Sequence, residues 1–236
     1  MWHTGPMSAA GVRARVRAEM TEEIKTVARR HLASDGANLS LRAVARDLGM
    51  ASSAVYRYFA SRDELLTALI IDAYDAVGAA AERAAEGVTG YTDRLVAVGL
   101  AVRDWALAEP YQWALIYGSP VPGYQAPPDT VGPATRVIMM IVSVVRDAFE
   151  AGAVTVGPPI TGRYADELSA VAAQLGSEIP AQLVGATMAA FVHLCGAVSA
   201  ELFGQLDNTV EDDRQGFFEF QMRGAARLIG LPETRS

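Results

Sequence analysis

The sequence predicts an all-α protein in which a small N-terminal group of three helices precedes a larger helical body. Apolar residues recur at intervals of three and four along most of the 236 residues, and no stretch alternates as a β-strand does. Charge divides the chain in the same way. Residues 1–62 hold ten basic and five acidic side chains, a surplus of five positive charges; because the whole chain carries −7, the remainder carries −12.

The first helix is predicted from about Arg17 to Asp35, and Gly36 is expected to end it. Residues 1–16 are predicted to form a flexible N-terminal arm. Its arginines, together with Arg17, are either contacts for a polyanion or ordinary solvated side chains.

The next stretch reads as two short helices joined by a glycine turn. Ser40 is a plausible N-cap for a helix whose apolar face recurs at helical spacing up to Leu48, and Gly49 supplies the turn. In the second helix Ala51, Ala54, Val55 and Phe59 are expected to face inward. This arrangement is typical of a helix-turn-helix, the DNA-binding motif whose second helix enters the major groove.

Polar side chains on the outward face suit contacts with phosphates and base edges. The predicted DNA-binding residues are Ser40, Arg42, Ser52, Ser53, Tyr56, Arg57, Tyr58 and Arg62. No carboxylate lies between Ser52 and Arg62, so nothing on that segment repels a DNA backbone. The alternative from spacing alone is a helical hairpin inside an ordinary all-α protein.

A fourth helix is predicted to start at Ser61, which forms a capping box with Glu64, and to end near Gly87 to Gly90. It leaves the N-terminal group of helices and enters the body, so it is expected to transmit movements between the two.

At these residues the sequence resembles the TetR family of transcriptional regulators. The resemblance lies in Gly49 through Phe59, followed by Ala-Ser-Arg-Asp-Glu-Leu-Leu at 60–66. Ala51 stands where a capping Ser or Thr is usual, and we expect Ser52 to cap the helix instead. The resemblance implies a helix-turn-helix DNA-binding domain over 17–64 and a helical effector-binding and dimerisation domain over 65–236.

The body is predicted to continue as helices separated by loops rich in proline and glycine. The predicted segments begin near residue 93 and continue over 111–117, 132–151, 164–175, 180–203 and 211–229. Residues 103–122 and 191–204 also resemble the WHG subgroup of the family, with Phe191 in place of its Trp, Cys195 in place of its His, and Gly196 matching.

The family resemblance implies a homodimer formed through 180–203 and 211–229, which binds a near-palindromic double-stranded DNA operator. Two DNA-binding domains related by a twofold axis read half-sites roughly 34–36 Å apart, which a single domain cannot do. The alternative for these two helices is the buried core of a single chain.

Aromatic and soft side chains in the body are candidates for an effector pocket, since such residues hold medium-sized apolar ligands. The predicted ligand-binding residues are Trp105, Trp113, Tyr117, Met139, Phe149, Phe191 and His193. The alternative is that most of them are ordinary residues of the hydrophobic core and bind no ligand.

The function expected from these features is a repressor released by a small apolar or aromatic ligand. A DNA-binding protein without an effector is the alternative, and an enzyme is a more distant one, since no nucleophile elbow, phosphate loop or metal-spaced His pair is present. One cysteine, Cys195, allows no multi-cysteine zinc site, and no cofactor is expected. Without a signal peptide or an evident membrane span, the protein is expected in the cytoplasm.

Overall fold

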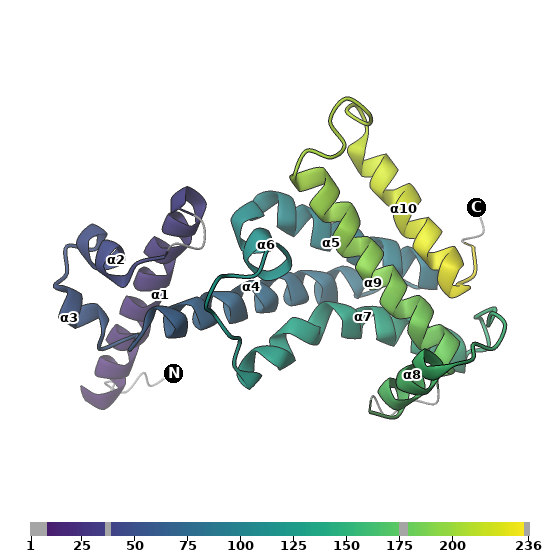
Figure 1. The fold of residues 1–236 in the computed structure, drawn as a ribbon, viewed down its shortest axis with the longest axis horizontal. Coiled ribbons are helices and arrows are strands. Elements are labelled where there is room, and N and C mark those ends of the chain that lie inside the picture. The colour runs from purple at the N-terminus through teal and green to yellow at the C-terminus, as the bar shows by residue number, and fades with distance from the viewer. Residues whose placement is uncertain (1–8, 36–38, 175–178, 234–236) are drawn as a thin grey trace, which may run out of the picture.

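The computed structural model describes residues 9–35, 39–174 and 179–233, and within those ranges every regular element is a helix (Figure 1). The elements are α1 (Ala9–Asp35), α2 (Leu41–Asp47), α3 (Ser52–Val55), α4 (Arg62–Ala85), α5 (Tyr91–Ala108), α6 (Pro110–Tyr117), the 3-10 turn η1 (Pro128–Thr130), α7 (Val131–Glu150), α8 (Arg163–Gln174), α9 (Ala181–Leu202) and α10 (Arg214–Ile229). The all-α prediction is therefore confirmed.

Helices α1, α2 and α3, with the start of α4, enclose the smaller of two hydrophobic cores, and we call this part the head. Its core includes Ile24, Val44, Val55 and Phe59, all nearly inaccessible to solvent. Ser40 caps α2 as predicted, since its Oγ accepts a hydrogen bond from the Ala43 amide at 3.4 Å. The φ of +66° at Gly49, which suits glycine, then turns the chain toward α3.

Two local predictions about the head were wrong. Helix α1 begins at Ala9, not near Arg17, so residues 9–16 of the predicted arm are helical; they contain good helix formers, and Arg15 pairs with Glu19 one turn later at 3.5 Å. Residues 1–8 lie outside the described part of the chain. Ala51 is exposed and is itself the N-cap of α3, without a side-chain cap bond, so Ser52 does not replace the missing cap.

Helix α4 links the head to the larger core of the body, as Figure 1 shows. Leu65 and Leu69 belong to the head core, whereas Val77 and Ala81 belong to the body core. The helix starts as predicted at Ser61, whose Oγ accepts from the Glu64 amide at 3.1 Å. Its 24 residues span roughly 36 Å at the α-helical rise.

Ion pairs fix α4 on both sides. In the head, Asp72 accepts from Lys25 and from Arg29 of α1, with nitrogen–oxygen distances of 2.8 Å to each. In the body, Arg136 of α7 donates to Glu82 at 2.8 and 2.6 Å and to Asp75 at 2.7 Å. The Arg136 hydrogen bonds lower the pKa of Glu82, so this carboxylate is stabilised in its charged form.

The body core is made mainly by α4, α5, α7, α9 and α10, and α6 and α8 add Trp113 and Ala172. Two of its stretches, 128–150 and 181–202, are long and apolar enough to cross a membrane by length and composition, which the sequence analysis did not single out. Both contribute fully buried residues to the core, Val144 and Leu194 among them. Packing inside the body therefore accounts for part of their apolar composition, while other apolar residues of these stretches, such as Val192, stay exposed.

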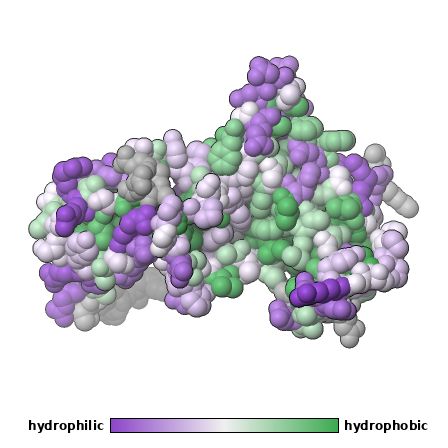
Figure 2. All heavy atoms as spheres, viewed as in Figure 1, coloured by the Kyte–Doolittle hydropathy of each residue, from purple (hydrophilic) through white to green (hydrophobic). Residues whose placement is uncertain are grey.

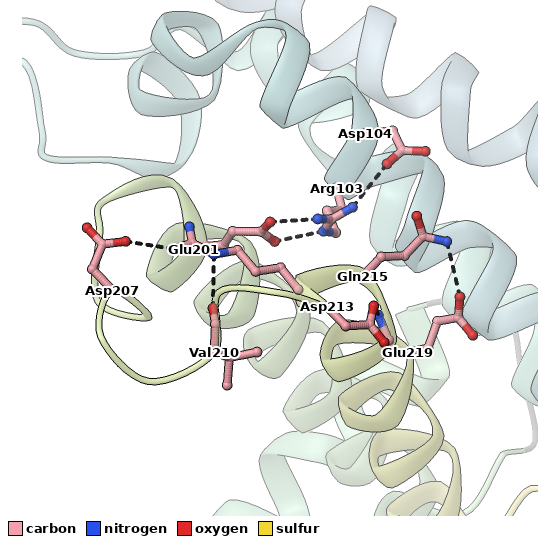
Figure 3. Close-up of polar contacts among 10 residues, drawn as sticks. Arg103, Asp104, Glu201, Asp207, Val210, Asp213, Gln215 and Glu219 are labelled. Atoms are coloured by element: carbon pink, nitrogen blue, oxygen red, sulfur yellow. Dashed lines mark hydrogen bonds and ion pairs between the residues drawn. The ribbon is translucent and has the colours of Figure 1, made fainter.

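A buried ion pair joins α5 to the end of α9 (Figure 3). Arg103 donates from Nε and Nη2 to the two carboxylate oxygens of Glu201, at 2.7 and 2.6 Å, and their side chains are only 9% and 5% exposed. A second carboxylate, Asp104, contacts the same guanidinium at 3.4 Å but is 69% exposed.

We expect Glu201→Ala to lower the free energy of unfolding by about 3 kcal/mol or more, because it leaves the Arg103 charge buried without a partner. The measurement is urea denaturation at one fixed protein concentration. Asp104→Ala is the control and should cost less than about 1 kcal/mol, since an exposed pair contributes little. Equal losses for the two variants would contradict this account of the pair.

Candidate nucleic-acid interface

The start of α2, the end of α3 and the start of α4 meet around a shallow surface hollow of about 440 Å³. Four of the predicted DNA-binding residues line it: Ser40, Arg42, Tyr56 and Arg62. Tyr56 is 45% exposed and Arg42 is exposed. Residues from three separate segments of the chain therefore present hydroxyl and guanidinium groups on one surface.

Three of the remaining predicted contacts lie at the two ends of helix α3. Ser52 and Ser53 form its first turn and are exposed, as is Arg57 just beyond its last turn. Because α3 is short and capped only by Ala51, the amides of its first turn are not used by a side-chain cap. The exposed hydroxyls at the start of α3 and the exposed Arg57 guanidinium beyond its end are suited to phosphate and base contacts.

Tyr58 differs from the predicted outward position. It is half-buried against the head core, and the guanidinium of Arg17 lies over its ring, 5.1 Å from the centroid. Arg17 also donates from Nη2 to the backbone carbonyl of Arg57 at 3.1 Å. Arg17 therefore holds the turn after α3 from a distance of 40 residues in the chain, a role that the sequence gives no signal for.

Arg62 is also partly committed to the fold. Its Nε donates to the carbonyl of Leu39 at 3.2 Å, and its Nη1 lies 3.2 Å from the Asp63 carboxylate. The side chain keeps 34% exposure, so it can tie the start of α2 to α4 and still face the hollow.

A histidine of α1 makes a hydrogen bond to the carboxylate at the end of α2. His31 Nε2 lies 2.8 Å from Asp47 Oδ2, and this hydrogen bond lowers the pKa of Asp47.

Three of the seven predicted ligand-binding residues come together in the body. The Tyr117 ring lies 4.4 Å from the ring of Trp113 and 6.2 Å from that of Phe191, centroid to centroid. Trp113 is fully buried, and its Nε1 donates to Ser199 Oγ at 3.1 Å. The ring of Tyr74, from α4, joins this aromatic cluster 5.8 Å from Tyr117.

The other four lie elsewhere. Trp105 and Phe149 pack half-buried on the body core. Met139 lines a separate apolar groove of about 190 Å³ between α7, α8 and α9. His193 is exposed on the face shared by α9 and α10, so it does not turn inward as predicted. Among the described residues, no group of three His, Cys, Asp or Glu side chains is placed to hold a metal ion.

The head is thus a helix-turn-helix DNA-binding unit carried on a larger helical body. Residues 24–69 match the model for the bacterial regulatory proteins of the tetR family, and residues 95–225 match the model for the Tetracyclin repressor-like, C-terminal domain. The chain belongs to the TetR family of transcriptional regulators. Membership of the WHG subgroup stays a prediction.

Similar proteins agree with this assignment over nearly the whole chain. The HTH-type transcriptional regulators Rv1816 of Mycobacterium tuberculosis and Mb1846 of Mycobacterium bovis are each 40% identical over 222 residues, which is 90% of this chain and 93% of theirs. The solved structure of the regulatory protein SCO4313 has a TM-score of 0.74 and 31% identity, covering 90% of this chain and 97% of that one. These relatives are regulators rather than enzymes.

We expect Arg17→Ala to weaken binding to a specific operator about tenfold, because Arg57 and Tyr58 lose a hydrogen bond and a cation–π contact. The measurement is fluorescence anisotropy with an operator selected from a random DNA library, at several salt concentrations. The salt slope should not change, because Arg17 positions the turn and does not contact phosphate. A uniform loss on all DNA, with the slope reduced by about one, would instead make Arg17 a phosphate contact. Arg30→Ala, which removes an exposed charge from the same helix, is the control.

Arg57→Ala should cost about 1–3 kcal/mol on the selected operator and relax its sequence preference, as expected when a guanidinium reads a base edge. The same anisotropy assay with single-base operator variants checks this. If the Arg57→Ala variant keeps the same sequence preference as the unaltered chain, Arg57 does not read a base.

Proposed function

We propose that the chain is a homodimeric repressor that binds a near-palindromic operator and is released from it by a small apolar or aromatic molecule. The observation that carries this proposal is the continuity of α4, which contributes buried residues to both cores. A change in body packing therefore moves the start of α4, and with it the hollow lined by Arg42 and Arg62. Regulators of this family bind DNA operators and typically act as dimers with small-molecule ligands.

The dimer interface we propose is the exposed apolar face of α9 and α10. Val192, Phe220 and Leu228 are 68%, 63% and 61% exposed. His193 and Phe220 line a shallow hollow of about 380 Å³ on this face. Figure 2 shows hydrophobic residues gathered on the body, whereas the head is largely hydrophilic. Large apolar residues exposed together mark an interaction surface, and this one lies within the predicted segments 180–203 and 211–229.

Release from DNA follows from a two-state equilibrium. In one state the two heads are spaced to read both half-sites, and in the other they are not. The effector shifts the balance only by binding the second state more tightly. Trp113, Tyr117 and Phe191 support an effector site next to α4, because the Tyr74 ring of α4 contacts their cluster.

The alternative is a dimer without an effector, whose body only holds the heads at the right spacing. A ligand that changes operator affinity separates the two proposals. Regulators of this family are cytoplasmic DNA-binding proteins, and we propose the same location here.

We expect Phe220→Asp to weaken dimerisation by about 2 kcal/mol or more, because it places a charge in a desolvated apolar interface. Sedimentation equilibrium measures the dimer dissociation constant, and operator affinity should fall with it. Val131→Asp is the matched control, because Val131 is 60% exposed but lies at the start of α7, away from α9 and α10 in Figure 1. A Phe220→Asp protein that remains as dimeric as the control would exclude this face as the interface.

A further inference from the structure

The first turns of α1 extend beyond the helix-turn-helix, and we call residues 9–16 the α1 extension. The segment that matches the family model begins only at residue 24. Val12 and Val16 of the extension are 40% and 51% exposed, so the head core does not cover them. In Figure 1 the N-terminal end of α1 projects past α2 and α3. The extension is therefore a helical arm held in place by the same helix that builds the head.

The extension lies in the part of the sequence that has positive charge and no carboxylate. No acidic residue precedes Glu19, whereas Arg13, Arg15 and Arg17 fall within five residues. Arg15 pairs with Glu19 at 3.5 Å, and Arg17 donates to the carbonyl of Arg57. Arg13 is exposed and makes no hydrogen bond or ion pair with the described residues. Its guanidinium is thus open to a partner from outside the chain.

Arg13 lies on the face of α1 that builds the head core. It precedes Arg17, Met20 and Ile24 at intervals of four, three and four residues, which places all of them on one side of the helix. Ile24 is fully buried in the head core, and Met20 packs against that core. Arg15 points to nearly the opposite side, since successive residues turn by about 100°. Arg13 therefore faces the side on which the rest of the head lies, and Arg15 faces away from it.

Arg17 shows how close this position is to the DNA-binding surface. Its guanidinium lies over the Tyr58 ring and donates to the carbonyl of Arg57, in the turn that follows α3. Arg13 is one helical turn further out, about 6 Å along the axis. Side chains of a helix lean toward its N-terminus, so the Arg13 side chain extends past that turn. A duplex that contacts Arg57 therefore has its sugar-phosphate backbone within reach of Arg13.

We propose that Arg13 contacts a backbone phosphate of the operator, next to the base pairs that α3 reads. A guanidinium binds phosphate oxygens through paired hydrogen bonds, and phosphates carry no sequence information. Arg13 therefore adds affinity and fixes the position of the head on the duplex, without selecting a sequence. This contact goes beyond the proposed function, because it requires neither an effector nor a change in the body.

The first experiment compares Arg13→Ala with Arg15→Ala by fluorescence anisotropy at several salt concentrations. Both substitutions remove one exposed charge from the same turn of α1 and introduce the best helix former, so the two proteins should melt at the same temperature. Arg13→Ala should weaken binding to the selected operator and to random DNA by the same factor, about fivefold for each bound head near physiological salt. It should also reduce the salt slope by about one for each head, whereas Arg15→Ala should weaken binding less than about twofold.

Neutralising single phosphates locates the contact. Methylphosphonate linkages are placed at one position at a time, symmetrically in both half-sites of the selected operator, and the affinities of the unaltered chain and of both variants are measured. At the phosphate that Arg13 contacts, the neutral linkage should cost the unaltered chain and Arg15→Ala about fivefold for each head. The same linkage should cost Arg13→Ala nothing, as expected when two groups act only through each other.

Three results would overturn the proposal. The first is an Arg13→Ala protein that binds as tightly as Arg15→Ala, and the second is a series in which no neutral linkage removes the difference between them. The third is a loss confined to the selected operator, because Arg13 would then read a base. Failure of the proposed function looks different: the unaltered chain itself would bind no selected operator more tightly than random DNA.

Discussion

The structure depends on one helix that is packed into two cores. Helix α4 is buried by the head at Leu65 and Leu69 and by the body at Val77 and Ala81. Because a helix is stiff along its axis, its two ends cannot adopt independent orientations. The ion pairs of Asp72 with α1 and of Arg136 with α4 hold this helix to a specific neighbour on each side. The head is therefore positioned by the packing of the body as well as by its own small core.

The head and the body also differ in charge and in surface chemistry. The head carries the positive charge, and its polar side chains surround a hollow formed by three segments. The body carries the excess of negative charge and the exposed apolar face of α9 and α10. A basic head on an acidic body orients the protein toward DNA, since the body is repelled by phosphate. In the function proposed above, sequence reading, dimerisation and ligand binding use separate surfaces connected through α4.

The helices and the helix-turn-helix could be predicted from the sequence because they depend on local signals. Ser40, Gly49 and the Ser61–Glu64 cap act within one turn of the chain, and apolar spacing marked the core faces of α2 and α4. Contacts between distant segments could not be predicted in this way. The bond of Arg17 to the carbonyl of Arg57, and the turn of His193 away from the aromatic cluster, depend on tertiary packing that spacing does not encode. Tyr117 was predicted as a ligand residue from its type, but only the structure shows that its hydroxyl is unpaired.

The most direct test of the central claim compares the affinity of the full chain for a palindromic operator, for one half-site and for random DNA of equal length. Fluorescence anisotropy at two salt concentrations measures all three. A dimer whose heads are spaced by α4 should bind the palindrome about a thousandfold or more tightly than random DNA, with the half-site far weaker than the palindrome and all three weakened by salt. Equal affinity for the palindrome and the half-site would contradict the account, because two heads held at a fixed spacing must gain from the second half-site.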